Sequence, residues 1–339
     1  MTFPRVHISP ELLRLLTEAT ELKVWISQAV VDVSWLPALQ KDTAARLAHS
    51  STAIEGNPLA LPEVQALCRG ESTGAPEKAA QEIRNYLGAM RWIWNRKAGA
   101  AITEGDLLRL HALLTAKTLP PAQVGRYKTK PNRVIGPDGR TVYSPPGPEQ
   151  ARPLTRQLIA WINGPESARL HPVIVNAVAH HRLVSIHPFA DGNGRAARAL
   201  GVWLLCARGF DTEHLFALDE FYEAERQRYY DKIQQARDLD GNLTYWLEYA
   251  AEAVLETLKK TRGRIESLKV SAVAPRMRLT KRQEDVLRLL RDRGRAKAPD
   301  LEAAFGLTRA RIAQVVKPLV DAGLVVREGR TRATTYRLA

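Results

Sequence analysis

The sequence predicts a mainly helical protein that carries one β-hairpin and ends in a small basic domain of three helices and a hairpin. Apolar residues recur at helical spacing through most of the first 265 residues, and a single β-prone segment interrupts them. Residues 276–339 hold 16 of the 50 Lys and Arg but only 7 of the 36 Asp and Glu. The length of 339 residues and the 25% content of charged residues are typical of a globular protein with two or three domains.

The first region, residues 1–74, is expected to be helical. Apolar residues recur through "ELLRLLTEATELKVWISQAV" and again through "TAARLAHSSTAIEG", where Gly56 and Pro58 end the second helix. The stretch "RGESTGAPEK" that follows is rich in Gly, Ser, Thr and Pro, which is typical of a loop. We therefore place a boundary near residue 74.

The second region, residues 75–265, combines helices with one hairpin. Val134–Ile135 and Thr141–Tyr143 are short β-prone runs on either side of Pro137-Asp138-Gly139, and an Asp-Gly pair at this place favours a hairpin turn. An isolated hairpin is marginal as part of a core. We expect it to form a flap over a site.

Two apolar helices are predicted around the stretch "HPFADGNG". The segment "HPVIVNAVAHHRLVSI" precedes it and "RAARALGVWLLCARG" follows it, with Gly209 at the end. The loop therefore leads into a helix N-terminus, where unpaired N–H groups favour an anion. Gly192 and Gly194 let the backbone approach a phosphate closely, and Asn193 offers a side-chain amide. Arg195 and Arg198 add two cations suited to phosphate oxygens.

The remaining polar residues of this stretch point to group transfer. Asp191 is suited to Mg²⁺, which takes one or two carboxylates together with phosphate oxygens. His187 has a side chain suited to removing a proton near neutral pH. A metal cluster that also includes His180 and His181 is the alternative. Adjacent side chains on a helix point about 100° apart, so hydrogen-bonded core or surface histidines are expected instead.

The twelve residues "HPFADGNGRAAR" resemble the Fic-domain motif, His-x-Phe-x-Asp/Glu-Gly-Asn-Gly-Arg/Lys-x-x-Arg, at every defined position. "GRYKTKPNRVIG", "DEFYEAERQRYYDKI" and "LTYWLEYAAEAV" extend the resemblance to about residues 45–260. It implies a helical Fic core with ATP as substrate and Mg²⁺ as cofactor. The implied enzyme is a protein adenylyltransferase that transfers AMP to a Tyr, Thr or Ser hydroxyl and releases pyrophosphate. The pair Gly194-Arg195 favours adenylylation over phosphorylation.

The resemblance also implies a role for individual residues. His187 would be the general base and Asp191 would hold Mg²⁺, while Phe189 would anchor the loop. The residues expected to bind nucleotide are Asp191, Gly192, Asn193, Gly194, Arg195, Arg198, Tyr229 and Tyr230. The flap, at Val134, Ile135 and Gly136, would hold the target protein in extended form by strand addition.

A second pattern, "SSTAIEGN", resembles the inhibitory helix of the family, Ser/Thr-x-x-x-Glu-Gly/Asn. Ser51 and Glu55 are four residues apart and share one face of a helix. The resemblance implies that Glu55 pairs with Arg198 and occupies the cation meant for the γ-phosphate. We therefore expect a self-inhibited enzyme.

The third region, residues 276–339, is similar to a winged helix-turn-helix. Thr280 and Gln283 form a capping box, Pro299 opens a second helix, and Thr308 caps a third. Pro318 inside the third helix is expected to kink or loosen it. Candidate DNA contacts are Arg309, Arg311, Gln314 and Lys317, with Arg327, Arg330 and Arg332 on the wing. Protein docking or dimerisation is the alternative use of such a domain.

The sequence limits the compartment and the partners. It shows no secretion signal and no apolar run long enough to cross a membrane, and Cys68 and Cys206 are far apart without metal-type spacing. A cytoplasmic protein with free thiols is expected. The expected partners are ATP and a protein target, with DNA or a second copy in a homodimer left open. Two other functions also stay open: a DNA-binding transcriptional regulator whose Fic domain senses nucleotide or modifies itself, and a bifunctional enzyme that also removes AMP.

Overall fold

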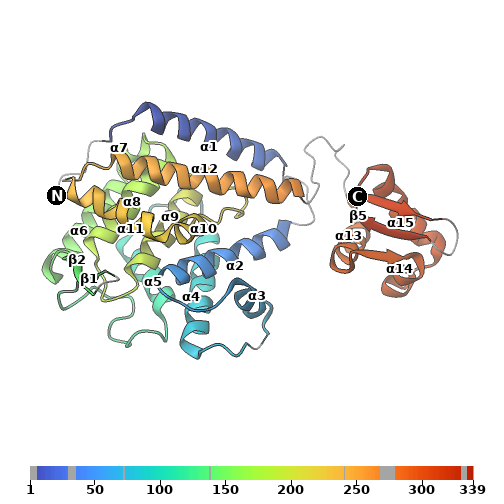
Figure 1. The fold of residues 1–339 in the computed structure, drawn as a ribbon, viewed down its shortest axis with the longest axis horizontal. Helices are drawn as coiled ribbons and strands as arrows, with labels where there is room; N and C mark the ends of the chain where they lie inside the picture. The colour runs from blue at the N-terminus through green and yellow to red at the C-terminus, as the bar shows by residue number, and fades with distance from the viewer. Residues whose placement is uncertain are drawn as a thin grey trace. The chain divides into compact units, whose positions relative to one another are not determined.

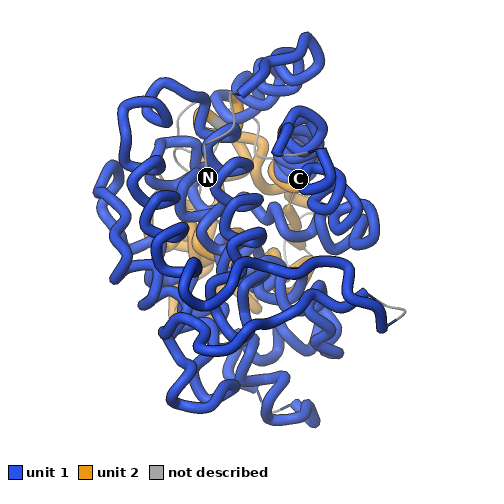
Figure 2. The backbone as a smooth tube through the Cα atoms, turned by 90° about the vertical axis from the view of Figure 1, so that its left-hand side faces the viewer, with its two compact units in different colours: residues 1–24, 40–261 blue, residues 25–39, 262–339 orange. Residues whose placement is uncertain are grey.

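The computed structural model describes residues 6–29, 36–71, 73–136, 139–239, 241–267, 279–329 and 334–338. The chain divides into two compact units, one of residues 1–24 and 40–261 and the other of residues 25–39 and 262–339 (Figure 2). The described residues are mainly helical, as expected (Figure 1).

The helices up to residue 267 build the frame for the Fic-like motif. In chain order they are α1 (Pro10–Ala29), α2 (Leu36–Ile54), α3 (Leu61–Arg69), α4 (Glu77–Trp94), α5 (Glu104–Thr115), α6 (Pro148–Ile162), α7 (Pro165–Ala168), α8 (Pro172–Ile186), α9 (Asn193–Ala207), α10 (Asp219–Ala224), α11 (Arg226–Asp238) and α12 (Thr244–Ser267). The helix α2 ends one residue before Glu55, and Gly56 follows with a positive φ of 92°.

The pair α8 and α9 forms the centre of the first unit. All residues of α8 from Val173 to Ile186 are buried, which explains why this segment is apolar on nearly every face. Pro172 is the first residue of α8, where its missing N–H group leaves no intrahelical bond unmade. The indole of Trp246 on α12 donates to the carbonyl of Ala177, at 2.7 Å. Such packing on all sides makes this helix pair a rigid support for the loop between them.

The expected hairpin consists of two very short strands, β1 (Val134–Ile135) and β2 (Thr141–Tyr143), which pair antiparallel. The N–H of Gly136 donates to the carbonyl of Arg140 at 2.8 Å and closes the pair toward its turn. Pro137 and Asp138 of the predicted turn lie outside the described residues. The side chains of Ile135 and Val142 are 55% and 47% exposed, so the hairpin presents apolar groups to solvent.

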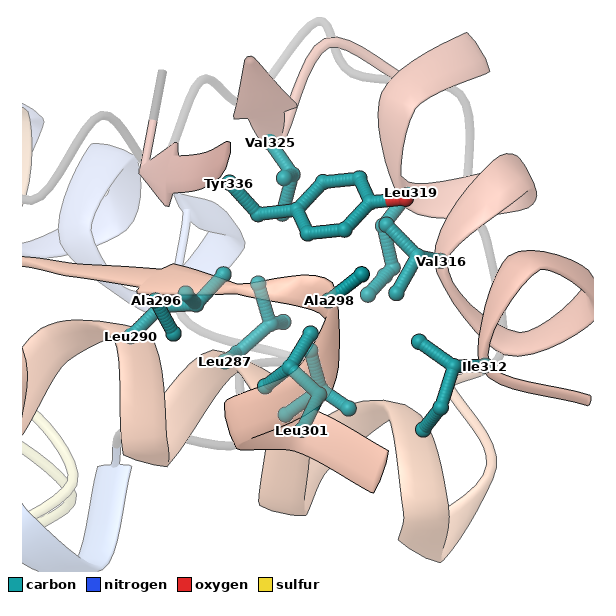
Figure 3. Close-up of a cluster of buried hydrophobic side chains, with 11 residues drawn as sticks. Leu287, Leu290, Ala296, Ala298, Leu301, Ile312, Val316, Leu319, Val325 and Tyr336 are labelled. Atoms are coloured by element: carbon teal, nitrogen blue, oxygen red, sulfur yellow. The ribbon is translucent and has the colours of Figure 1, made fainter. Parts of the chain in front are cut away.

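The basic C-terminal segment contains three helices, α13 (Lys281–Arg293), α14 (Ala298–Phe305) and α15 (Arg309–Asp321), and a three-stranded antiparallel sheet in the order β3-β5-β4. The strands are β3 (Arg295–Lys297), β4 (Val325–Glu328) and β5 (Thr335–Leu338). Leu287, Leu290, Leu301, Ile312 and Leu319 point toward one another and toward Tyr336 of the sheet (Figure 3). This cluster gives the three helices and the sheet a common apolar core.

The structure corrects several details of the expected C-terminal domain. The strand β3 between α13 and α14 was not expected, and the side chain of Thr308 makes no capping hydrogen bond. The predicted capping box is present, because Thr280 N–H donates to the Gln283 side chain at 2.9 Å. The helix α15 runs to Asp321 with Pro318 inside it, and the expected kink or loosening at this proline stays a prediction. Arg330 and Arg332 lie outside the described residues.

Cys68 and Cys206 are free and partly buried, as expected for unpaired thiols. Within the described ranges, every helix is too short or too polar for a membrane-crossing segment.

Candidate active site

The loop between α8 and α9 is held in a fixed conformation by its own residues. His187 ends α8 in the left-handed region at φ 51°, and Gly192 precedes α9 at φ 78°. The side-chain amide of Asn193 donates to the carbonyl of Phe189 and accepts from its N–H, both at 2.9 Å. The amide of Asn193 therefore braces the loop and is not directed at an anion, in contrast to the sequence interpretation. Its backbone N–H still belongs to the first turn of α9.

The ring of Phe189 is fully buried and anchors this loop. It stacks on His111 of α5, with 3.9 Å between ring centroids. His111 Nε2 also lies 3.0 Å from the carbonyl oxygen of Asp191, and His111 Nδ1 accepts from the N–H of Gly125 at 3.0 Å. The second contact assigns the proton of this ring to Nε2, which then donates to Asp191. His111 thus locks the loop from the side, a role that no motif in the sequence indicates.

His187 is oriented as a base. Its Nδ1 lies 3.2 Å from the carbonyl oxygen of Val184, which fixes the proton on Nδ1 and leaves the lone pair of Nε2 available. Burial lowers the pKa of His187 to about 4, and the cations Lys128 and Arg237 contribute to this direction. The imidazole is therefore neutral at physiological pH. A neutral imidazole with a free Nε2 is able to accept a proton from a hydroxyl group.

Asp191 and the first turn of α9 line the other side of the loop. The Asp191 side chain is 61% exposed, and its Oδ1 accepts from the N–H of Gly192 at 2.6 Å. Its Oδ2 lies 3.6 Å from Arg195, whose side chain is only 5% exposed. Within the described part of the chain, Nε and Nη1 of Arg195 are buried and make no hydrogen bond. An exposed carboxylate, a helix N-terminus and an underused guanidinium fit a magnesium–phosphate group.

The strongest contact at the site joins Arg198 to the end of α2. The Arg198 side chain is 1% exposed, and its Nη2 donates to Glu55 Oε1 at 2.7 Å and to the carbonyl of Ser51 at 2.7 Å. Its Nε donates to Ser51 Oγ at 2.9 Å. A Cβ atom added at Gly194 would collide with the Glu55 carboxylate. The carboxylate therefore lies against the first turn of α9, where a phosphate would bind.

A buried carboxylate lies behind Arg198. Asp219 at the start of α10 is fully buried, and its Oδ2 is 3.8 Å from Arg198 Nε. Tyr86 of α4 donates to the same oxygen at 2.8 Å. Burial raises the pKa of the Asp219 carboxyl, and the charge of Arg198 opposes that shift. Arg198 is thus positioned from two sides, by α2 and by α10.

The two tyrosines expected at the nucleoside occupy different environments. Tyr229 is 1% exposed, and its hydroxyl lies 2.8 Å from His180 Nε2 within an aromatic cluster, so its ring has no surface to offer a nucleoside in this conformation. Tyr230 is 39% exposed and donates to the carbonyl of Ile54 at 3.1 Å. Tyr230 therefore lies beside the end of α2, next to Glu55. The expected nucleoside contact is compatible with the position of Tyr230 only.

His180 and His181 are core residues. His180 bonds Tyr229, and His181 Nε2 lies 3.2 Å from the carbonyl of Ile233. Burial lowers the pKa of both rings, that of His181 to about 3. These separate partners exclude the alternative in which both histidines share a metal with His187.

The flap is attached to α8 close to His187. The hydroxyl of Tyr143 on β2 donates to the carbonyl of Ser185 at 2.9 Å, and the guanidinium of Arg237 lies 3.7 Å from the Tyr143 ring centroid. Arg237 also donates to the carbonyl of Val184 at 3.1 Å, the same group that orients His187. The hairpin that contains the flap residues therefore contacts the last turn of α8 through its second strand, β2. These flap residues are Val134, Ile135 and Gly136.

Lys128 and Arg237 are site residues that the sequence did not single out. The backbone N–H of Lys128 donates to the carbonyl of Pro188 at 2.9 Å, and its ammonium group donates to Asn132 at 2.7 Å. Burial lowers the pKa of the Lys128 ammonium. The hairpin segment contains Lys128 in "YKTKPN", but only its contacts distinguish it from the other lysines nearby.

Comparison with known proteins agrees with this geometry. Residues 101–205 match the sequence profile described as the Fic/DOC family. A protein adenylyltransferase Fic from Culex quinquefasciatus is 28% identical over 228 residues, which cover 66% of this chain and 42% of that protein. One from Drosophila virilis is 28% identical over 229 residues. The chain thus spans less than half the length of these curated relatives.

Solved structures support the same fold. A Fic family protein from Desulfovibrio desulfuricans has a TM-score of 0.74 at 23% identity, with 100% of this chain and 98% of that chain covered. Fic-1 from C. elegans has a TM-score of 0.59 at 24% identity, with 74% and 71% covered. The motif His187–Arg198 lies inside the range 101–205 that matches the Fic/DOC profile.

Proposed function

We propose that this protein is a self-inhibited protein adenylyltransferase, which transfers AMP from ATP to a side-chain hydroxyl of a protein. The observation that carries the proposal is the orientation of His187, a neutral base whose Nδ1 faces Val184, beside an anion site at the start of α9. The chain's similarity to proteins named protein adenylyltransferase Fic supports the reaction class.

In this proposal the residues of the loop divide the work. Nε2 of His187 takes the proton of the target hydroxyl as its oxygen attacks the α-phosphorus. The backbone N–H groups at the start of α9, with Arg195, hold the phosphate oxygens. Asp191, with its exposed carboxylate, would hold Mg²⁺, and the ion would supply positive charge against the phosphate oxygens. The bond from the α-phosphorus to the bridging oxygen breaks, and pyrophosphate leaves.

The contact between Glu55 and Arg198 supports the proposed self-inhibition. The guanidinium of Arg198 already donates once to Glu55 and twice to Ser51. These N–H groups are therefore not available to a γ-phosphate. The Glu55 carboxylate also adds negative charge where a phosphate would bind, above Gly194. ATP then binds without its reactive phosphate aligned, and transfer is slow until Glu55 moves away.

The flap is proposed to receive the target as an added strand. Ile135 and Val142 expose apolar side chains on a two-stranded hairpin, which is a suitable edge for an extended segment. The contact between Tyr143 and Ser185 places this edge near His187.

Labelling with ATP that carries a tag on its AMP part, which is transferred with the α-phosphate, tests this function. The protein with Glu55→Gly is incubated with a cell lysate, and the protein with Glu55→Gly and His187→Ala is the matched blank. Bands present only with the first variant identify AMP acceptors, and a self-modified band identifies the protein itself. Equal labelling by both variants, with ATP bound by each, would refute the assignment of His187 as the base.

A second function is proposed for the C-terminal helices. We infer that residues 276–339 form a winged helix that binds DNA, because Arg309, Arg311, Gln314 and Lys317 are all exposed on α15 while Ile312, Val316 and Leu319 face the core. An exposed basic helix face suits phosphate and base contacts. Salt-dependent binding of the full chain to duplex DNA supports this inference, and binding that does not vary with salt contradicts it.

A further inference from the structure

A second cluster of reactive side chains lies at the opposite end of α9 from the phosphate site. It consists of Cys206 in the last turn of α9 and Asp211 and His214 in the loop that follows. One sulfur, one carboxylate oxygen and one imidazole nitrogen of these residues lie within 4.8 Å of one another. The helix α9 runs from Asn193 to Ala207, so this cluster lies about 20 Å from the first turn at a rise of 1.5 Å per residue.

The Asp211 carboxylate is set with one oxygen facing the imidazole. Its Oδ1 accepts from the N–H of Thr212 at 2.8 Å and from the N–H of His214 at 3.1 Å. Its Oδ2 lies 2.6 Å from Nδ1 of His214. One oxygen therefore fixes the carboxylate against the backbone, and the other remains for a ligand.

The imidazole of His214 is held in plane and is underused. Its ring stacks on the indole of Trp94, with 4.8 Å between centroids and 15° between planes. Nδ1 is buried and makes no hydrogen bond within the described residues, although Asp211 Oδ2 is adjacent. His214 Nδ1 and Asp211 Oδ2 are thus close together, but no N–H is directed from one to the other. This arrangement suits two atoms that donate lone pairs to the same cation.

We propose that Cys206, Asp211 and His214 bind a zinc ion, with water in the fourth position. A thiolate, an imidazole and a carboxylate are the three side-chain donors that zinc takes in proteins, at about 2.3, about 2.0 and about 2.0 Å. Tetrahedral bonds of these lengths separate the donor atoms by roughly 3 to 4 Å. Small side-chain rotations bring the three donor atoms from within 4.8 Å to these separations. The thiol of Cys206 releases one proton when it binds.

The ion would join α9 to a loop that also contacts two other parts of the unit. The side chain of Gln40 on α2 donates to the carbonyl of Glu213 at 2.9 Å, and the loop continues to Asp219 behind Arg198. Glu213 and His214 both have positive φ, 53° and 60°, which is unfavourable for residues other than glycine. A metal bond to His214 would offset this strain and stabilise the loop against local unfolding.

Cobalt substitution tests the site in the untagged full-length protein. The protein is stripped with chelator and titrated with Co²⁺, whose near-ultraviolet band arises only from a thiolate ligand and whose visible bands report tetrahedral geometry. We expect about one equivalent to produce both sets of bands, and about one equivalent of Zn²⁺ to remove them, in line with the site preference for zinc.

Three variants decide whether this cluster is the ligand set. Cys206→Ser removes the thiolate band, and Asp211→Asn and His214→Gln lower the Co²⁺ affinity about 100-fold or more, beyond the 10- to 100-fold effect of an outer-shell partner. Cys68→Ser is the matched control, because Cys68 is the other free and partly buried cysteine of the chain. Circular dichroism of each metal-free variant shows whether it is folded. Unchanged cobalt spectra in folded Cys206→Ser, or wild-type protein that takes up no Co²⁺ and no Zn²⁺, would overturn the proposal.

Discussion

Replacing Glu55 should raise adenylyl transfer and lower stability at the same time. The change Glu55→Gly removes the carboxylate that accepts from Arg198 at 2.7 Å and lies above Gly194. A hydrogen bond to a charged group contributes about 1.5 to 3 kcal/mol. If this bond must break before Arg198 pairs with the γ-phosphate, its loss lowers the barrier to productive binding by the same amount. The initial rate of transfer then increases about 10-fold to about 150-fold.

The cost in stability is smaller than the loss of a whole buried ion pair. Arg198 keeps its bonds to Ser51 Oγ at 2.9 Å and to the Ser51 carbonyl at 2.7 Å, so its buried charge retains partners after the change. We expect the free energy of unfolding to fall by about 1 to 2 kcal/mol, which corresponds to a few degrees in Tm. Glu55→Gln leaves a neutral acceptor for the charged guanidinium and should give an intermediate rate, because the bond is then charge-assisted by the donor alone.

Self-modification with α-labelled ATP measures the rate, and scanning calorimetry measures Tm. Glu71→Gly is the matched control, because Glu71 pairs with Arg69 on the exposed surface and should alter neither quantity measurably. Equal initial rates in Glu55→Gly and wild type, with both folded and both binding ATP, would refute the reasoning. They would show that the Arg198 contact does not limit productive ATP binding.

Four other predictions concern His187, the pH dependence of transfer and of stability, and the C-terminal helices. His187→Ala should reduce transfer at least 100-fold, in line with loss of a general base, while the affinity for ATP measured by calorimetry changes little. The rate of transfer at substrate concentrations well below saturation should stay level from pH 8 down to about pH 5 and fall near pH 4. Under these conditions the rate reports the free enzyme, in which the pKa of His187 is about 4 and only the neutral ring accepts a proton. The free energy of unfolding should also fall as the pH is lowered, because burial lowers the pKa of His111 to about 4. Below about pH 6.5 the unfolded chain takes up a proton at this histidine before the folded chain does, so up to about 3 kcal/mol of the free energy of unfolding is lost by pH 4. Urea unfolding measures this loss. Arg311→Ala should reduce the salt slope of DNA binding by about 1 if Arg311 contacts a phosphate, and an unchanged slope would place it outside the interface.

The chemistry of the loop could be read from the sequence because it is local. The motif packs a base, a carboxylate, two glycines and two arginines into His187–Arg198, and a helix N-terminus turns that order into geometry. The motif does not predict the partner of each side-chain hydrogen bond. Asn193 was expected to donate to phosphate, yet its amide is used by the backbone of Phe189.

Contacts between distant segments were predicted only where a second motif existed. Glu55 was paired with Arg198, 143 residues away, through a resemblance and not through any local pattern, whereas the hydrogen bonds of Ser51 to Arg198 were not predicted. His111, Lys128 and Arg237 have no such pattern, because each acts through backbone carbonyls that the sequence does not place. The same reason explains why β3 was missed: its three residues become a strand only by pairing with β5, about forty residues later.

The helix α9 connects the contact proposed to inhibit the enzyme with the loop that follows its other end. Arg198 lies inside this buried helix and is held by Ser51 through two atoms, so α2 stays attached when Glu55 alone moves away. The opposite end of α9 leads into the loop that Gln40 of α2 also holds, through Glu213. The helix α2 is therefore fixed near its beginning by Gln40 and near its end by Ser51, while Glu55, the residue proposed to block phosphate binding, lies just past its last residue. Release then requires rotation of one side chain and the residues next to it, not departure of the helix, which is why a large gain in transfer is compatible with a small loss of stability.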